Sequence, residues 1–148
     1  MKKKILIIGK KSFIGANLNI YLSKFFSVKK ISFNQAIKKK KEYFLDYNYL
    51  INTTIHPNYI KKKYKKIYDL DRILSEKILN TNVKYFFFNS RKIYKPHIGI
   101  SEKAKLKPAD VYSKNKIVTE SFLIKKLDKN LISLRVSNVI GKRIFKRN

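Results

Sequence analysis

The sequence contains no cysteine. This absence excludes a disulfide framework, a thiolate zinc site and a thiol nucleophile, and it fits a reducing compartment. The sequence also has no apolar run of membrane-spanning length. Its lysine-rich beginning imitates a signal peptide, but the apolar stretch ILII that precedes Gly9 is too short for one. We therefore expect a cytoplasmic protein without a membrane partner.

Acidic residues are scarce. Nine Asp and Glu oppose 36 Lys and Arg, which gives a formal net charge of +27. Such a charge alone would indicate nucleic acid or an anionic surface as a partner. Most of the basic residues are lysines spread over every segment, whereas base readout usually favours arginine on a defined reading element. We therefore expect the lysines to lie on solvated faces, and no nucleic-acid partner is expected.

Short apolar runs alternate with helical periodicity, which is typical of an α/β fold with a parallel sheet. With 148 residues, 44% of them hydrophobic, the chain can bury one sizeable core, so residues 1–148 are predicted to form a single domain. The segment between the second and third predicted strands has too few residues for a further helix, strand and helix. The outer strand that a full mononucleotide-binding half would place there is therefore predicted to be missing. The predicted strands are 5–8, 28–33, 49–52, 83–88 and 131–136, and a long amphipathic helix is predicted over 59–79.

Glycine is scarce as well, and two of the four glycines, Gly9 and Gly15, lie in the segment GKKSFIG. A predicted strand turns into a helix across this segment. Glycines let the backbone approach an anion, and a helix N-terminus offers free N–H groups, so the segment fits the pyrophosphate of a dinucleotide. The alternative is a simple tight turn into a helix. The context favours the dinucleotide site and a doubly wound, Rossmann-like sheet.

The second predicted strand ends without a carboxylate. An acidic side chain at this point would bind the ribose 2′-hydroxyl of NAD, but the sequence has Asn34 and Gln35 there. Lys10 and Lys11, within the glycine segment, can instead meet a 2′-phosphate. The sequence therefore slightly favours NADP as the cofactor and leaves NAD open.

Tyr112 and Lys116 stand four positions apart in a predicted helix, on one face. An ammonium close to a phenol lowers the phenol's pKa, which makes tyrosine a general base near neutral pH. The spacing alone means little in a chain with ten tyrosines and so many lysines. It gains weight because it follows, after one loop, a predicted strand that ends at Ser90. His56 and His97 are predicted to be loop residues, with no carboxylate neighbours to indicate a metal.

Five segments together carry a resemblance to a known family. They are GKKSFIG, NTT at 52–54, FFFNSRKIY at 86–94, SEKAKLKPADVYSKNK at 101–116 and LRVSNVIG at 134–141. In order and spacing the chain resembles the extended short-chain dehydrogenase/reductase family, and within it the sugar-nucleotide epimerases and dehydratases. The resemblance covers nearly the whole chain.

The resemblance implies a role for each matched residue. Tyr112 would move a proton at a sugar hydroxyl, Lys116 would bind the nicotinamide ribose and tune Tyr112, and Ser90 would hydrogen-bond the reacting oxygen. The family's phosphate loop is matched by Gly9, Ser12, Phe13, Ile14 and Gly15. The loop after the family's fourth strand is matched by Asn52 and Thr54, and its substrate-contacting asparagine by Asn138.

The implied activity is that of an NAD(P)-dependent epimerase, dehydratase or reductase, with hydride and proton transfer at a carbon of a nucleotide sugar. Three features depart from the family's pattern. Ser12 replaces the central glycine, and Lys95 stands where a glycine usually follows the pair matched by Ile93 and Tyr94. The chain also stops at Asn148, soon after LRVSNVIG, whereas the family continues into a smaller substrate-binding domain.

We therefore expect a cofactor-binding core whose C-terminal substrate part is absent or truncated. Two explanations are open: the chain is a truncated form of a longer enzyme, or a second copy or another partner supplies the missing wall of the substrate site. An uncovered apolar sheet edge predicts poor solubility or self-association. The alternatives from other classes are a noncatalytic dinucleotide-binding or interaction module and, less favoured, a basic nucleic-acid-binding protein.

Overall fold

The sheet has five parallel strands in the order β2-β1-β3-β4-β5. The computed structural model describes residues 2–96 and 98–142. The chain moves outward from β1 to β2 and then returns to β3 on the other side of β1, so the predicted doubly wound α/β topology is confirmed, with its switch point between β1 and β3. The strands are β1 (Lys4–Ile8), β2 (Ser27–Ile31), β3 (Tyr49–Asn52), β4 (Lys84–Ser90) and β5 (Leu131–Val136).

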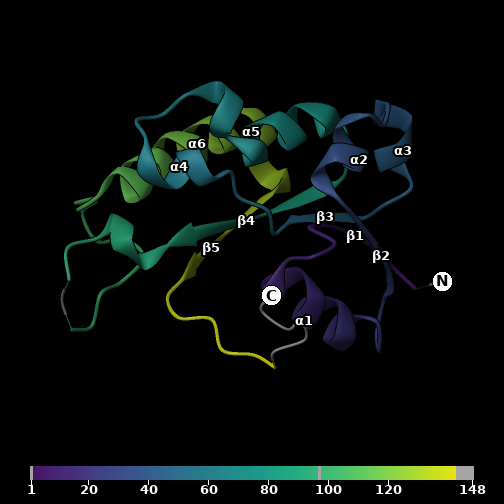
Figure 1. Ribbon diagram of the computed structural model, residues 1–148, viewed down its shortest axis with the longest axis horizontal. Coiled ribbons are helices and arrows are strands. Elements are labelled where there is room, and N and C mark those ends of the chain that lie inside the picture. Colours follow the sequence, from purple (N-terminus) through teal and green to yellow (C-terminus); the bar gives the residue numbers. More distant parts are fainter. Residues whose placement is uncertain (1, 97, 143–148) are drawn as a thin grey trace.

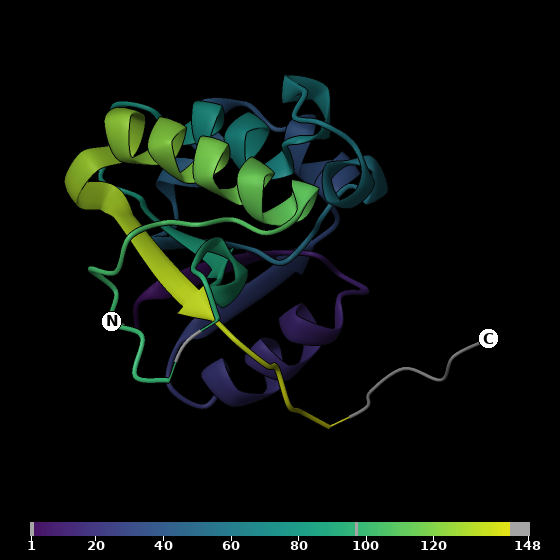
Figure 2. The same cartoon turned by 90° about the vertical axis from the view of Figure 1, so that its left-hand side faces the viewer.

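Helices cover both faces of the sheet, but unequally. The helix α1 (Phe13–Leu22) lies on one face, and five helices lie on the other (Figure 1, Figure 2). Those five are α2 (Phe33–Ile37), α3 (Lys41–Leu45), α4 (Pro57–Lys61), α5 (Leu70–Ser75) and α6 (Val111–Leu127). Within the described residues, no helix combines the length and the apolar character that crossing a membrane requires.

The segment between β2 and β3 is abbreviated, as the sequence predicts. It holds the short helices α2 and α3 in place of an outer strand, which leaves β2 at the edge of the sheet. The strand β2 ends two residues before the predicted end because Ser32 caps α2. Its hydroxyl accepts a hydrogen bond from the Gln35 N–H, and the Gln35 side chain accepts one from the Ser32 N–H.

The prediction of one long helix over 59–79 is wrong. This stretch contains the end of α4, a 3₁₀ turn (Lys66–Tyr68), α5 and a second 3₁₀ turn (Glu76–Ile78). The chain leaves α4 at Lys62 in an extended conformation, and Asp69 starts α5 by accepting a hydrogen bond from the Arg72 N–H. The apolar periodicity is real, but the caps divide it into short helices.

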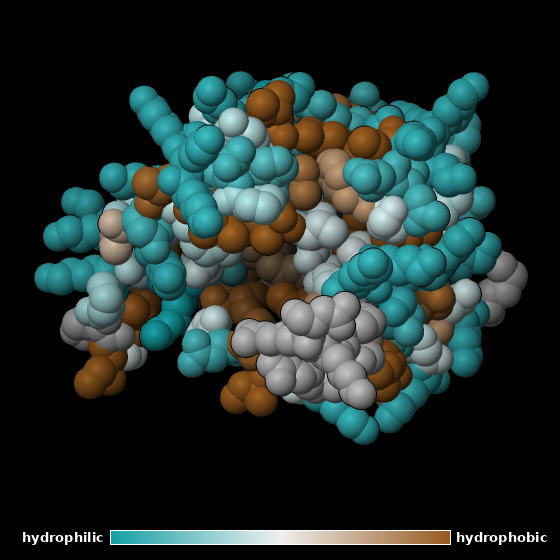
Figure 3. All heavy atoms as spheres, viewed as in Figure 1, coloured by the Kyte–Doolittle hydropathy of each residue, from teal (hydrophilic) through white to brown (hydrophobic). Residues whose placement is uncertain are grey.

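Side chains alternate between the two faces of each strand. On β4, Tyr85, Phe87 and Asn89 are buried beneath the helices α2–α6, while Phe86 and Phe88 on the α1 side are only half-buried. A groove of about 390 Å³ lies along that second face between α1 and β5. Figure 3 shows apolar side chains gathered in a hollow below β4 and β5. The core is therefore dense on one side of the sheet and open on the other.

Candidate functional site

The strand β1 turns into α1 through a glycine segment. Gly9 has a φ of +125°, in the region that favours glycine, and a Cβ added there would collide with the Thr53 hydroxyl. A Cβ on Gly15 would lie 2.7 Å from the same hydroxyl and 2.9 Å from the Gly9 carbonyl oxygen. Both glycines are thus needed for the turn to lie against the loop that follows β3.

Ser12, which replaces a glycine of the family pattern, caps α1. Its hydroxyl accepts a hydrogen bond of 3.3 Å from the Gly15 N–H, and its own N–H donates to the Gly9 carbonyl. Phe13 and Ile14 form the first turn of the helix, whose N–H groups lack partners within the helix itself. The segment has the predicted strand, glycine turn and helix N-terminus, with exposed Lys11 beside the turn. Its role as a phosphate loop stays a prediction.

Asn52 and Thr54 lie at the carboxyl end of β3, next to this turn. The Asn52 side-chain oxygen accepts hydrogen bonds from the Thr54 N–H at 3.0 Å and the Thr54 hydroxyl at 2.6 Å. The Thr53 hydroxyl donates to the Ile8 carbonyl at the end of β1. The structure therefore brings the loops after β1 and β3 together at the switch point, where open α/β sheets bind ligands.

Asn34 was predicted to lie at the end of the second strand, but it lies in a helix. It lies in the first turn of α2, and Gln35 is engaged in the capping of that helix. Only Ser32 and Phe33 separate these residues from β2, and the Ile31 carbonyl at the end of β2 accepts a hydrogen bond from the Gly9 N–H. The beginning of α2 is thus close to the glycine turn.

Ser90 and Asn138 line one pocket of about 430 Å³. The Ser90 hydroxyl accepts a hydrogen bond from the Lys92 N–H, and Asp110 caps α6 at the same pocket. Hydrogen bonds from Ser113 hold the pKa of the Asp110 carboxyl below its usual value. The full lining is Ser90, Arg91, Lys92, Tyr94, Pro96, Ile100, Ala109, Asp110, Ser137 and Asn138.

Tyr112 does not line that pocket. Its ring meets the ring of Tyr59 on α4 edge-to-face, with 6.4 Å between the centroids. Tyr112 and Lys116 do share one face of α6, and the Lys116 ammonium is 5.7 Å from the centre of the Tyr112 ring. The two residues are neighbours, as the spacing predicts.

The predicted lowering of the Tyr112 pKa is not found. Burial raises the pKa of the Tyr112 phenol above its ordinary value, and the carboxylates of Asp71 and Asp110 raise it further. The Lys116 side chain is 6% exposed, and its ammonium lies 3.8 Å from Asp71 Oδ2. The ammonium therefore has a carboxylate partner that the spacing of Tyr112 and Lys116 does not reveal.

Asp71 is the site residue that sequence reasoning missed. It lies on α5, and its Oδ1 accepts hydrogen bonds of 2.8 Å each from the Asn52 amide and the Tyr85 hydroxyl. A signal was available, because Asp71 stands at helical spacing from Ile67, Leu74 and Ile78, on the face that is otherwise apolar.

The loop after β3 is tied to the end of β1 by the Thr53 hydroxyl, which donates to the Ile8 carbonyl just before the glycine turn. From the same loop, contacts continue from Thr54 through Asn52 and Asp71 to Lys116.

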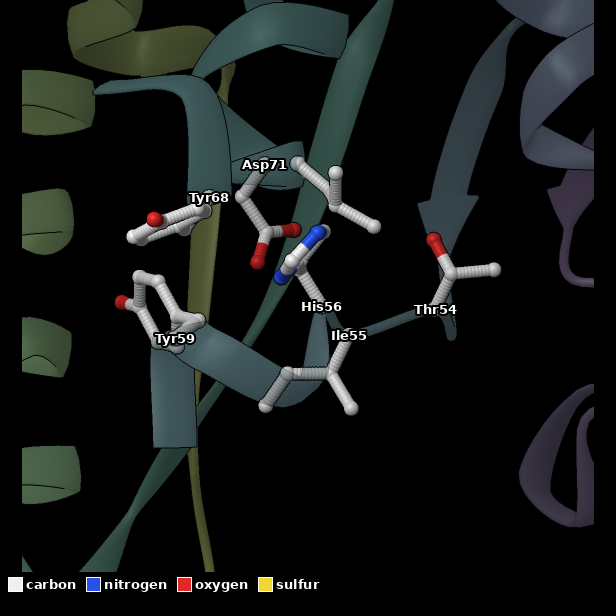
Figure 4. A pocket seen from close by; sticks show the side chains of 7 residues that line it. Thr54, Ile55, His56, Tyr59, Tyr68 and Asp71 are labelled. Carbon is white, nitrogen blue, oxygen red and sulfur yellow. The ribbon is translucent and has the colours of Figure 1, made fainter. Parts of the chain in front are cut away.

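A small pocket lies beside Asp71, between residues 54–59, which run from the β3 loop into α4, and residues 68–71 (Figure 4). Thr54, His56 and Tyr59 line it from one segment, and Tyr68 and Asp71 from another. His56, predicted as a loop residue, caps α4 through Nδ1 and stacks on Tyr68. No cluster of His, Cys, Asp or Glu suited to a metal ion occurs in the part of the chain that the structure describes, and His97 lies outside that part.

Comparison with known proteins finds likeness in structure only. No family model and no curated protein matches the chain. A dTDP-4-dehydrorhamnose reductase from Clostridium acetobutylicum matches with a TM-score of 0.70 and 19% identity, over 89% of this chain and 52% of that one. A dTDP-4-dehydrorhamnose reductase from Bacillus anthracis in complex with NADP matches with a TM-score of 0.74 and 15% identity, over 93% and 54%.

A UDP-N-acetylglucosamine 4-epimerase from Methanobrevibacter ruminantium, in complex with UDP-N-acetylmuramic acid, matches with a TM-score of 0.71 and 19% identity, over 91% of this chain and 55% of that one. These likenesses establish a Rossmann-like fold. The chain spans about half the length of each of the three proteins.

Proposed function

We propose that this chain is the dinucleotide-binding core of an NAD(P)-dependent enzyme acting on a nucleotide sugar by epimerisation, dehydration or reduction. The observation that carries the proposal is the set of contacts that ties the loop after β3 to the end of β1 and continues to Lys116, located at the carboxyl ends of β1 and β3. The reductases and the epimerase of the same fold support it, one of them with NADP bound and another with a nucleotide sugar bound.

The residues present fit a dinucleotide. Gly9 and Gly15 keep open a turn that side chains would fill, and the first turn of α1 offers N–H groups to a pyrophosphate. Exposed Lys11 and the Asn34 region, which lacks a carboxylate, suit a 2′-phosphate, so we take NADP as the first choice over NAD. The cofactor would supply the hydride.

The chain's own side chains have separate tasks in this proposal. Ser90 hydrogen-bonds the reacting sugar oxygen, and Asn138, from the same pocket, contacts the substrate. Tyr112 moves the proton, and Lys116 contacts the nicotinamide ribose. The segment after β5 that carries Asn138 is held against α1 by hydrogen bonds between Asn17 and Lys142.

Binding of the cofactor is the test. NADPH fluorescence should change saturably when wild-type protein is added. The change should disappear in Gly15→Asp, because the new carboxylate enters the turn and repels phosphate. Ile20→Asp is the matched control, since it adds the same side chain to an exposed position of α1 and should bind normally.

Because Gly15→Asp is crowded, circular dichroism must show that the variant is folded. The variant Ser12→Gly provides an independent test of cofactor binding. Removing the hydroxyl cap frees the Gly15 N–H, costs only a few tenths of a kcal/mol, and should tighten NADPH binding. If neither wild type nor Ser12→Gly binds NADPH or NADH, the proposal is refuted.

A noncatalytic dinucleotide-binding module is the second candidate. The observation that favours it is that Tyr112 packs against Tyr59 and does not line the pocket that contains Ser90 and Asn138. Saturable NADPH binding without turnover of dTDP- or UDP-linked keto sugars would support this module over the enzyme.

A further inference from the structure

Lys116 and Asp71 form a charge pair in the interior. Their side chains are 6% and 10% exposed, and the ammonium also lies 4.5 Å from the centre of the Phe87 ring. A charge removed from water to this degree requires a counter-ion or hydrogen bonds. Asp71 receives both, since Asn52 and Tyr85 donate to one carboxylate oxygen while the other faces the ammonium.

The pair joins two parts of the candidate site that come from distant segments. Asp71 is connected through Asn52 to the loop after β3, and Lys116 stands one turn after Tyr112 on α6. An ammonium acting alone would stabilise the phenolate of Tyr112. With a carboxylate 3.8 Å from the ammonium, the two opposite charges largely offset each other at the phenol.

We propose, building on the function above, that Asp71 is a positioning residue. Its carboxylate holds the Lys116 ammonium toward the end of β3 and keeps Tyr112 in its protonated form. A protonated phenol suits a site that donates a proton. The reaction favoured is reduction of a sugar ketone. A bound reduced nicotinamide would supply the hydride for the carbonyl carbon and be oxidised in doing so, while Tyr112 donates its proton to the carbonyl oxygen and is reprotonated from water.

Lys116 and Asp71 each oppose the effect of burial on the other's pKa, as a charged pair does. Burial lowers the pKa of Lys116, and Asp71 opposes that effect most strongly. Burial raises the pKa of Asp71, opposed by Lys116 and by the hydrogen bond from Asn52. Other titratable groups surround the pair and Tyr112. They are Tyr59 on α4, Tyr85 on β4, Glu120 in the middle of α6, and the N-cap residues His56, Asp69 and Asp110 of α4, α5 and α6.

The test is a pH titration of Tyr112 by NMR in protein labelled with ¹³Cζ-tyrosine, with the signal assigned by its loss in Tyr112→Phe. The wild-type midpoint should lie above 10. In Asp71→Asn the ammonium is no longer offset, so the midpoint should fall by about one pH unit or more. Asp71→Glu should restore a midpoint near that of wild type.

Asp110→Asn is the matched control, because the same chemical change is made in a carboxylate that is 44% exposed, and asparagine also caps helices. It should shift the midpoint much less. An unchanged midpoint in folded Asp71→Asn would overturn the positioning role, because a purely structural aspartate would lower stability alone.

Lys116→Met covers the case in which Asp71→Asn fails to fold, since methionine suits the aromatic surroundings of the ammonium. In Lys116→Met alone the Asp71 carboxylate is no longer offset, so the Tyr112 midpoint should rise by about one pH unit. In the double variant Asp71→Asn/Lys116→Met both charges are removed, so the midpoint should stay within about half a unit of wild type. A rise of more than about one unit in the double variant would show an unopposed lysine in the wild type and refute the proposal. These titrations use no cofactor, so their failure is distinct from a failure of NADPH binding.

Discussion

The two faces of the sheet differ in how completely they are covered. Beneath α2–α6, Tyr85 and Phe87 are fully buried, and the charge pair of Asp71 and Lys116 is enclosed with them. On the α1 face, Phe86 and Phe88 from the same strand border an open groove of about 390 Å³. Five helices against one account for the difference (Figure 1). The closed face carries the stability, and the open face leaves apolar surface available for contact.

The largest effect is expected at the centre of the closed face. Phe87→Ala should lower the free energy of unfolding by about 3–5 kcal/mol, because it leaves a cavity in a packed core. Phe88→Ala is the matched control on the same strand and should lose less than half as much, since its ring borders the groove. Urea denaturation of both variants measures the difference. Equal losses would mean that the two faces contribute alike to stability.

A second prediction concerns alkaline pH. Burial, followed by the Asp71 carboxylate, raises the pKa of Tyr85 well above its ordinary value. The folded protein therefore keeps this proton above pH 10, where the unfolded chain loses it. The stabilisation is complete below about pH 10, and above it the free energy of unfolding falls by about 1.4 kcal/mol per pH unit for each such tyrosine.

Tyr85→Phe removes one group of this kind, so its free energy of unfolding should fall less steeply between pH 10 and 11.5, by about 1.4 kcal/mol per unit. Urea denaturation across that range gives the slope. Tyr21→Phe, at a side chain that is 60% exposed, should leave the slope unchanged. An identical slope in Tyr85→Phe and wild type would contradict the burial argument.

The sequence predicted the closed face better than the site enclosed in it. Alternating apolar runs placed all five strands, and the shortness of 34–48 correctly removed the outer strand. Glycine in a glycine-poor chain marked the turn after β1. These features depend on local physics, namely strand periodicity, capping and the steric demands of a tight turn.

What the sequence could not give depends on contacts between distant segments. The partner of Lys116 comes from α5, 45 positions earlier, and no spacing rule connects the two residues. The Tyr112 pKa was expected to fall because only the neighbouring lysine was considered, whereas burial and Asp71 raise it. In the run FFF at 86–88, periodicity distinguishes the two faces but does not say which one is covered.

The smallest change in stability is expected on the open face, together with a clear change in self-association. Leu134 lines the groove and is 38% exposed, so Leu134→Ser should change the free energy of unfolding by less than about 1 kcal/mol. Uncovered apolar surface promotes association, so the variant should sediment with a lower weight-average mass than wild type at equal concentration. Lys125→Ser, on exposed α6 surface, is the control and should behave as wild type. If wild type and Leu134→Ser associate equally, the groove is not the contact surface, and the incomplete cover of this face has no consequence for assembly.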